Sequence, residues 1–595
     1  MTTTIHICNV EYRDYTNWCI EPPIEKSTIH PLEYKLFHGD QFKCTITEEE
    51  NSTPSIEIKQ SPIRSNPNIP GILLLENNRT YGRTSNQKRL YYKCRPYDTK
   101  LPNFLIPFDI PMGFNKNFKN KYVTFQYDHW NEKHPHGKLS QNLGDVHDFP
   151  AYCEYALYCK CLHESITKSI TYTKQRLKSQ TFEQYMMQIL KSPETYGSFL
   201  KRDDDNVFSI DPEGCMDRDD ALSIYQSKNT NEMCRYKVSV YIANVWVWLD
   251  ALDLWDHIGK RISTIYFPIM KRPMLPTALG EQLCSLDQEH RRFGFVMDFI
   301  VVEDFKKGTI YIQDTETKYP KISQCTLTVK NNYDYEEPTL LTNTSYQLLQ
   351  KITQKLDPQA TDSHEVVAYW MMQMNHYAAK QMKKHQMGIY RIVQSKNPES
   401  TNTNQNDSSI SQTPIPTFVR ILEQQLSGSY CVFHMDQTYT HETLGFSEYI
   451  HFTSPIRRMV DLLNQIVWVK DMIKPMIMSE KAIQFYQSQV DHLDKLNEKM
   501  KKIRRIQSDC DILYQVLNTP DLMQKVFEGM VVSIQEEKCG FYIEELKWLT
   551  QIPKQDTLVK YQKIPCKLYM FEKEEQMKRK IRVQLIEQTP NNTVE

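Results

Sequence analysis

The feature that most constrains this chain is a cluster of carboxylates between two apolar segments. The segments 207–210 and 221–225 are apolar enough to predict two buried strands. The residues between them include Asp211, Asp217, Asp219 and Asp220. Anionic oxygens held this close together repel one another and raise each other's pKa, unless a cation neutralises them. The arrangement therefore predicts either a cation-binding loop or a solvated acidic loop.

The residue types in this loop favour a divalent metal. Pro212 and Gly214 predict a turn that brings Asp211 back toward the later aspartates. Oxygen ligands on a tight loop suit Mg²⁺, with Mn²⁺ as the other candidate, whereas zinc would favour Cys or His. The apolar flanks argue against a free, solvated tail.

Composition sets the class of protein. The 595 residues predict about three to five domains. Because Lys and Arg number 72 against 73 Asp and Glu, any contact with nucleic acid must come from local basic clusters. The 15 cysteines form no Cys-x-x-Cys pair, which favours reduced thiols and no structural metal. Without a signal peptide or a run of about 18 apolar residues, we expect no membrane association and a cytoplasmic or nuclear location.

The N-terminal third predicts β-structure. Strands are expected at 41–47 and 55–58, and then four more follow within a small barrel, at 71–75, 90–94, 103–107 and 122–127. Aromatic and basic residues alternate in this second group as in a face that stacks on bases and binds phosphates: Arg89, Tyr91, Tyr92, Lys93, Arg95 and Trp130. The alternative is that the tyrosines only cover the barrel.

The middle of the chain alternates helices with a large sheet. Helices are expected within 151–200 and at 362–384, a long central strand at 236–248, and a hairpin from 292–302 and 309–313. The polar, low-complexity segment 396–417 reads as an exposed insertion.

A second motif, 451–462, reads His-Phe-Thr-Ser-Pro-Ile-Arg-Arg-Met-Val-Asp-Leu. Ser454-Pro455 predicts a helix start, which would put Arg457 and Arg458 in the first turn. Positive charge is unfavourable there, so an anion such as a phosphate would complete the site. The alternative is that one of the arginines pairs with Asp461.

The last part of the chain predicts one long helix and a final barrel. No Gly or Pro interrupts 476–519, and the basic face Lys499, Lys501, Lys502, Arg504 and Arg505 could follow a phosphate backbone or could simply be solvated. Strands are expected at 529–534, 540–543, 566–570 and 581–586, forming an OB-type barrel. Its Phe541 and Tyr542 are candidates for stacking or for core packing.

Together, the two motifs resemble the paired signatures of the ribonuclease II/ribonuclease R (RNB) family of exoribonucleases, which stand about 230 residues apart here. The resemblance continues through Tyr266-Phe-Pro, Pro273-Met-Leu-Pro276, Leu283-Cys-Ser-Leu286 and Gly388-Ile-Tyr-Arg391. Upstream, 96–102 and 136–139 resemble the second cold-shock barrel of the exosome-type members. The endonuclease domain of the exosome subunit has no room in this chain.

The resemblance implies a multidomain α+β fold: a central mixed α/β RNB catalytic domain flanked by small OB-fold or cold-shock β-barrels. The expected division is a degenerate first barrel at 1–68, a second at 69–165, a helical connector at 166–205, the RNB domain at 206–522 and a C-terminal barrel at 523–595.

The family implies processive, Mg²⁺-dependent 3′→5′ hydrolysis of single-stranded RNA to 5′-mononucleotides. Asp211, Asp217, Asp219 and Asp220 would hold metal, with Asp219 also placing the metal or the activated water, and Arg457 and Arg458 would bind the scissile phosphate. The residues expected to contact RNA are Tyr266, which would stack on terminal bases, and His451, Ser454 and Arg391. Two divalent ions about 4 Å apart would activate water and stabilise the leaving oxygen.

Five positions differ from the usual family pattern: Asn244, Tyr369, Met459, Asn464 and Gln465. They suggest a divergent member. The alternative function is a catalytically weakened RNB-fold protein that binds RNA or regulates its translation. We expect a monomer or a subunit of an RNA-decay complex.

Overall fold

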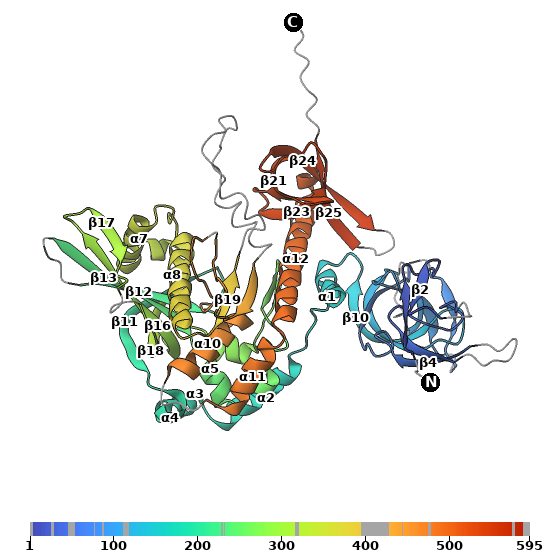
Figure 1. Cartoon of the computed structure of the whole chain (residues 1–595), viewed down its shortest axis with the longest axis horizontal. Helices are drawn as coiled ribbons and strands as arrows, with labels where there is room; N and C mark the ends of the chain where they lie inside the picture. Colours follow the sequence, from blue (N-terminus) through green and yellow to red (C-terminus); the bar gives the residue numbers. More distant parts are fainter. Residues whose placement is uncertain are drawn as a thin grey trace, which may run out of the picture. The chain divides into compact units, whose positions relative to one another are not determined.

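The chain is described by a computed structural model (Figure 1). The described residues are 4–24, 29–45, 54–76, 78–85, 88–110, 118–227, 230, 232–315, 320–393, 428–442, 444–473, 478–573 and 578–586. The predicted insertion at 396–417 lies outside them. The chain forms two compact units: residues 1–163, 267–269 and 505–595 make the first, and residues 164–266 and 270–504 make the second.

The first unit begins with a four-stranded antiparallel sheet in the order β2-β1-β3-β4. Its strands are β1 (His6–Val10), β2 (Trp18–Glu21), β3 (Gln41–Thr45) and β4 (Ser55–Gln60). The two strands expected here correspond to β3 and β4, whereas β1 and β2 were not predicted. That this region is a cold-shock barrel stays a prediction.

A six-stranded sheet follows and closes into a barrel. Its strands are β5 (Ile69–Leu73), β6 (Thr80–Arg83), β7 (Leu90–Pro96), β8 (Phe104–Phe108), β9 (Lys121–His129) and β10 (His136–Asp145). Their order is β5-β9-β10-β8-β7-β6, and β5 also pairs with β7. Gly71 lies at this closure, where a Cβ atom would come within 2.8 Å of the Cys94 sulfur. The predicted small barrel is confirmed.

The core of this region contains two of the residues expected on a stacking face. Tyr92 and Trp130 are 2% and 5% exposed, and Trp130 stacks on Phe37 with ring centroids 4.8 Å apart. For these two aromatics the packing alternative is correct. Alternation along β7 points Tyr92 inward and leaves Tyr91 and Lys93 half-buried, and Trp130 follows directly after β9.

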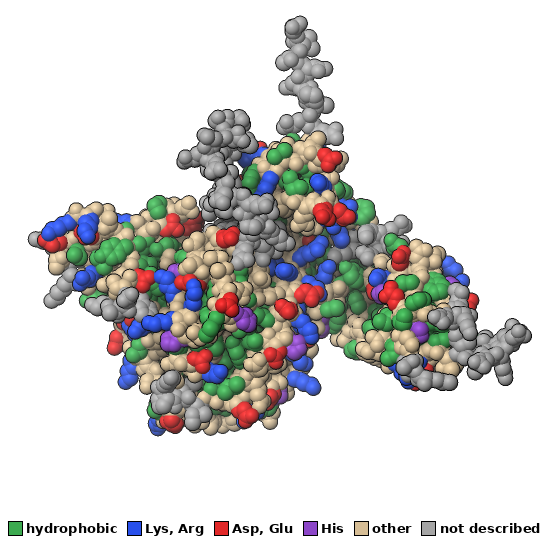
Figure 2. Space-filling view, viewed as in Figure 1, with side chains coloured by type: hydrophobic (Ala, Val, Ile, Leu, Met, Phe, Trp, Pro, Cys, Tyr) green, Lys and Arg blue, Asp and Glu red, His purple; other side chains and the backbone are tan. Residues whose placement is uncertain are grey.

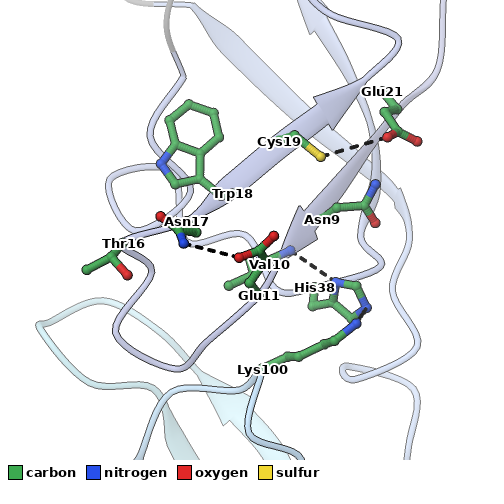
Figure 3. Close-up of a pocket in the computed structure, with 10 residues that line it drawn as sticks. All are labelled: Asn9, Val10, Glu11, Thr16, Asn17, Trp18, Cys19, Glu21, His38 and Lys100. Carbon is green, nitrogen blue, oxygen red and sulfur yellow. Dashed lines mark hydrogen bonds between the residues drawn. The ribbon is translucent and has the colours of Figure 1, made fainter. Parts of the chain in front are cut away.

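A pocket of about 560 Å³ lies beside the first sheet (Figure 3). Its lining is mainly polar and includes Trp18, His38 and Lys100. The His38 Nδ1 accepts a hydrogen bond from the Val10 N–H at 3.1 Å, and burial together with the Lys100 charge lowers the pKa of His38. None of the predicted site residues lines this pocket.

The first unit also contains the C-terminal sheet, in the order β23-β22-β21-β24-β25. Its antiparallel strands are β21 (Val526–Ile534), β22 (Lys538–Ile543), β23 (Trp548–Pro553), β24 (Lys563–Lys573) and β25 (Lys578–Leu585). Phe541 and Tyr542 are 0% and 7% exposed, so both serve core packing rather than a stacking surface.

The second unit is built on a mixed sheet that closes on itself. Its strands are β11 (Leu200–Asp211), β12 (Asp220–Gln226), β13 (Met233–Ala243), β16 (Arg291–Asp304), β17 (Thr309–Ile312) and β18 (Ile322–Asp334). The order is β13-β12-β11-β18-β16-β17, and β13 also pairs with β16. The β11–β18 pair is parallel and the other pairs are antiparallel.

The long central strand expected at 236–248 is wrong in its second half. β13 ends at Ala243, and the helix α5 (Val245–Ala251) begins after Asn244, whose side chain accepts the Val247 N–H at 3.2 Å. The apolar run Val245–Leu249 is completely buried, and a run buried on every side has no periodicity that separates strand from helix.

Helices complete both units. They are α1 (Phe149–Cys159), α2 (Thr167–Ser179), α3 (Phe182–Leu190), α4 (Pro193–Tyr196), α6 (Pro338–Leu341), α7 (Thr344–Leu356), α8 (Ser363–Lys384), α10 (Met459–Met472), α11 (Glu480–Val490) and α12 (Leu493–Asn518), with the short elements η1 (Trp255–His257), η2 (Ala278–Cys284) and η4 (Pro520–Met523). Short strands β14 (Ile265–Phe267), β15 (Met270–Arg272), β19 (Ile389–Ile392) and β20 (Ser429–Val432) lie between them.

The single helix expected over 476–519 is two helices within its described residues, because α11 ends at Val490 and α12 begins at Leu493. Of the described residues, none belongs to a helix long and apolar enough to cross a membrane. Basic and acidic side chains are interspersed over the face in Figure 2, in agreement with the net charge of −1.

Asn464 links α10 to β19 and should be important for stability. Its side chain is completely buried, accepts the Ile389 N–H at 2.8 Å, and donates to the carbonyls of Ile389 and His451 at 3.0 and 2.9 Å. Asn464→Ala would leave these buried backbone groups without partners. We expect a loss of about 2–4 kcal/mol in the free energy of unfolding, measured by urea denaturation followed by tryptophan fluorescence.

Asn518→Ala provides the matched control, because Asn518 is exposed and donates only to the Tyr514 carbonyl at the end of α12. Equal denaturation midpoints for the two variants would contradict this role of Asn464.

Candidate active site

The acidic loop connects two neighbouring strands of the second unit's sheet. Asp211 is the last residue of β11 and Asp220 is the first of β12, and these strands pair antiparallel. The predicted turn is present: the Cys215 N–H donates to the Pro212 carbonyl at 3.0 Å, and Gly214 has a φ of 73°, which favours glycine. The chain therefore returns all four carboxylates toward one end of the sheet.

Asp211 and Asp220 repel each other. Burial, followed by the Asp211 charge, raises the pKa of Asp220 to about 7, although Arg457 opposes the shift. Burial also raises the pKa of Asp211, against hydrogen bonding from Ser209 and the Arg218 charge. The Asp211 Oδ2 is buried without a hydrogen-bond donor, and the Arg218 Nε lies 3.6 Å from it. A cation would relieve both the repulsion and the missing contact.

Asp219 joins the acidic loop to the second motif. It is 2% exposed, and its oxygens accept hydrogen bonds from the Ile456 N–H at 2.8 Å and the Arg457 Nε at 3.1 Å. Burial raises the pKa of Asp219 despite the opposing Arg457 charge. The Arg457 side chain is 48% exposed and also donates to the Ser454 hydroxyl at 3.2 Å. The rest of its guanidinium is therefore accessible to a ligand.

Asp217 has a different partner, Lys271, which sequence reasoning did not identify. The Lys271 Nζ lies 3.0 Å from the Asp217 Oδ1 and 2.7 Å from the Glu281 Oε1. Burial would lower the pKa of Lys271, but the two carboxylates raise it above its ordinary value. Lys271 lies on β15 within a proline-rich loop and Glu281 lies on η2, so no sequence spacing indicates that they meet.

Arg458 forms an ion pair with Asp461, which lies three residues later in the first turn of α10. Its Nε and Nη2 donate to the two oxygens of Asp461 at 2.8 and 3.0 Å, and the Ser454 N–H donates to the same carboxylate at 2.7 Å. For this arginine the alternative of pairing with Asp461 is correct. The predicted helix start is wrong: α10 begins at Met459, because Ser454–Arg458 forms a turn whose Ile456 N–H is bound by Asp219.

The other predicted RNA-contacting residues lie around these two motifs. Arg391 is 7% exposed, and its guanidinium lies 5.1 Å from the ring centroid of Tyr430. The Tyr430 hydroxyl bonds the His451 Nδ1 at 2.7 Å, and burial together with the charge of Arg458 holds the pKa of His451 well below its ordinary value. Ser454 is buried in the turn.

Positive charge accumulates beside this histidine. Burial lowers the pKa of Arg504, and the nearby Arg391 charge lowers it further. Within the described part of the chain, no ion pair joins Arg391 or Arg504 to a carboxylate. Such a region suits an anionic ligand.

Tyr266 is 39% exposed on β14. Burial and the charge of Asp217 raise the pKa of its hydroxyl to about 12, while Arg457 opposes this shift. The Thr264 N–H, two residues before Tyr266, donates to the Arg457 carbonyl at 3.0 Å, so Tyr266 lies near the second motif, and its ring remains accessible to a flat ligand.

A divalent metal fits part of the predicted ligand set. Among the described residues, no group of three or more His, Cys, Asp and Glu is arranged to hold a metal ion. Asp217 and Asp219 already accept hydrogen bonds from cationic side chains, whereas the Arg218 Nε lies 3.6 Å from Asp211. Asp211 and Asp220 are therefore the better candidates for a metal ion. Mg²⁺ typically takes one or two protein carboxylates and completes its shell with water and substrate phosphate. These two carboxylates and the unsatisfied Asp211 oxygen suit such an ion.

The positions that differ from the family pattern are buried within the scaffold. Asn244 donates to the Gln324 amide oxygen at 3.0 Å, and Gln465 donates to the Ala243 carbonyl at 2.8 Å. Asn464 holds β19, while Met459 and Tyr369 are 0% and 9% exposed. Asn244, Asn464 and Gln465 thus hydrogen-bond within the scaffold, and the side chains at all five positions are buried.

Comparisons with known proteins identify similar chains. A family model described as RNB domain matches residues 201–355 and 339–474, and one described as Dis3-like cold-shock domain 2 (CSD2) matches residues 91–159. Ribonuclease R of Chlamydia trachomatis is 25% identical over 351 residues, which cover 50% of this chain and 49% of that protein. The human exosome complex exonuclease RRP44 is 24% identical over 417 residues, 58% of this chain and 41% of that protein.

The chain thus spans about half the length of the curated relatives it matches. Among solved structures, Mycoplasma genitalium RNase R in complex with ribose-methylated single-stranded RNA has a TM-score of 0.62 at 15% identity. The match covers 98% of this chain and all of that one. At this identity the similarity concerns the fold, which is multidomain α+β with small barrels of the OB or cold-shock type.

Asp220 should make stability depend on pH. Its raised pKa keeps the carboxyl protonated in the folded protein up to about pH 7, whereas the unfolded chain ionises near pH 4. The stability from this group is therefore complete below about pH 4 and is lost as the pH rises through about 7. We expect Asp220→Asn to raise the Tm in EDTA more at about pH 8.5 than at about pH 4.

Differential scanning fluorimetry would measure the change in Tm at both pH values. Asp314→Asn changes an exposed carboxylate beside Lys380 and should give no such pH-dependent gain. A Tm gain from Asp220→Asn that is the same at both pH values would contradict the assignment.

Proposed function

The chain belongs to the RNB-domain family that includes ribonuclease R and Dis3-type proteins, and we propose that it is a Mg²⁺-dependent 3′→5′ exoribonuclease. It is a homologue of RNB-family exoribonucleases. The finer proposal is that it hydrolyses single-stranded RNA processively and releases 5′-mononucleotides.

One observation carries the proposal: the acidic loop and the arginine motif meet directly. Asp219 binds the Ile456 N–H and the Arg457 side chain, although 237 and 238 positions separate these residues in the sequence. Carboxylates that can hold a cation and an arginine that can bind a phosphate thereby share one location. This combination supports cleavage of a phosphodiester bond.

Asp211 and Asp220 would hold the Mg²⁺ ion. When bound there, the ion would supply Lewis-acid chemistry by lowering the pKa of an attacking water and stabilising the developing negative charge. The two carboxylates are suited to this role because the Asp211 charge raises the pKa of Asp220, and because the Asp211 Oδ2 has no hydrogen-bond donor among the described residues, with the Arg218 Nε 3.6 Å away.

Arg457 would bind the scissile phosphate. Asp219 and Ser454 fix its Nε and Nη2, so the side chain is oriented before RNA arrives and its remaining N–H groups can donate to phosphate oxygens. Asp219 therefore acts on the reaction by positioning Arg457. Arg458, which is paired with Asp461, would hold the turn rather than bind phosphate directly.

Other residues would bind the RNA chain. The half-exposed ring of Tyr266 could stack on a terminal base, which suits single-stranded substrates because their bases are unstacked. Arg391 and His451 lie in a region with an excess of positive charge and would bind a neighbouring phosphate, with Ser454 supporting the turn beside them.

The four aspartates and both arginines are present, which favours an enzyme, whereas the departures from the family pattern motivate the alternative of a weakened RNA-binding protein. Asn244, Asn464 and Gln465 have hydrogen-bond partners within the scaffold, so the altered positions are structurally compensated. We also propose the domain division given by the sequence, with the catalytic domain at 206–522. The proposed location is cytoplasmic.

Asp219→Asn tests the function directly. The amide oxygen would still accept a hydrogen bond from the Ile456 N–H, but the substitution removes the negative charge that orients Arg457. With 3′-tailed single-stranded RNA and Mg²⁺, we expect wild-type protein to release mononucleotides and the variant to do so about 10² to 10³ times more slowly. RNA affinity, measured by fluorescence anisotropy in EDTA, should change little.

Asp314→Asn is the matched control, since it removes an exposed carboxylate, one that pairs with Lys380. RNA binding without any mononucleotide release by the wild-type protein would reject the enzyme and support the RNA-binding alternative.

A further inference from the structure

The ion pair between Lys271 and Asp217 changes the number of carboxylates available to metal ions. The Lys271 ammonium lies 3.0 Å from Asp217 and 2.7 Å from Glu281. Asp217 is 8% exposed, and Glu281 and Lys271 are 17% and 32% exposed. The group is thus shielded from solvent more than a surface ion pair, so its electrostatic attraction is less screened.

Three different structural elements build this group. Asp217 lies on the acidic loop, Lys271 on β15 and Glu281 on η2. Because two carboxylates from different elements bind the ammonium, its position does not depend on a single contact. The ammonium already supplies a positive charge 3.0 Å from the Asp217 Oδ1.

The other aspartates of the acidic loop differ from Asp217 in their cationic partners. Asp219 is also bound by a cationic side chain, Arg457. The Asp211 Oδ2 has no hydrogen-bond donor among the described residues, although the Arg218 Nε lies 3.6 Å from it. Hydrogen-bonded cationic groups are therefore already present at Asp217 and Asp219, and Asp211 and Asp220 are the pair at which one further cation would bind.

We propose that Lys271 takes the place of a second metal ion, so that this chain binds one divalent cation rather than two. The single ion would bind at Asp211 and Asp220, and the Lys271 ammonium would provide the second positive charge beside Asp217. This inference rests on the proposed function and specifies its metal requirement.

The charge balance explains why removing the ammonium should create a metal site. In Lys271→Met, Asp217 and Glu281 would be two neighbouring carboxylates with no cation between them. Their repulsion would favour capture of a divalent ion. The methionine keeps a side chain of similar length, which limits the loss of packing.

Mn²⁺ binding to the full-length protein without RNA tests the proposal. Electron paramagnetic resonance titration would count the bound ions, and Mg²⁺ would be added as a competitor to identify the sites that it can displace. We expect one competable Mn²⁺ per wild-type chain and two per Lys271→Met chain. The double variant Lys271→Met/Glu281→Gln, which removes one carboxylate charge, should return to one.

Lys306→Met is the matched control, because it also removes one ammonium from an ion pair, with Glu232, but at an exposed position. It should bind one ion. Two competable ions on the wild-type chain, or only one on Lys271→Met with an unchanged circular dichroism spectrum, would overturn the role of Lys271.

The outcomes separate this inference from the proposed function. A wild-type chain that binds no competable Mn²⁺ would reject the metal site at Asp211 and Asp220, and with it the proposed mechanism. A wild-type chain that binds two ions and hydrolyses RNA would reject only the role of Lys271.

Discussion

The hydrogen bonds from Ile456 and Arg457 to Asp219 hold the two parts of the site together. A carboxylate that is only 2% exposed would be strongly unfavourable without such partners. The same contacts fix the turn before α10, which is also held by the bonds that Asp461 accepts from Ser454 and Arg458. The buried carboxylates of Asp219 and Asp461 thus fix the turn that carries Arg457.

The four aspartates have distinct roles because their neighbours differ. Asp217 is bound by an ammonium and Asp219 by a guanidinium, whereas Asp211 lies 3.6 Å from the Arg218 Nε and its charge raises the pKa of Asp220. Hydrogen-bonded cations balance the charge at the first two aspartates but not at the last two. A binding site for one cation follows from this distribution, and the orientation of Arg457 follows from the same loop.

Sequence patterns predicted the parts of the fold and site that depend on local signals. The acidic loop, its Pro212–Gly214 turn and the short strands around it follow from spacing and alternation. The helix α5 was missed because the buried run Val245–Leu249 is apolar on every side, and only Asn244 marks its start. Lys271 could not be found, since it meets its partners through tertiary structure alone.

The central claim is that Asp219 and Arg457 act as one unit in RNA cleavage. A double-mutant cycle on single-turnover RNA hydrolysis in Mg²⁺, using Asp219→Asn, Arg457→Met and their combination, measures this coupling directly. The account predicts that the double variant is no slower than the slower single variant, because each change removes the same function. Losses that multiply in the double variant would contradict it.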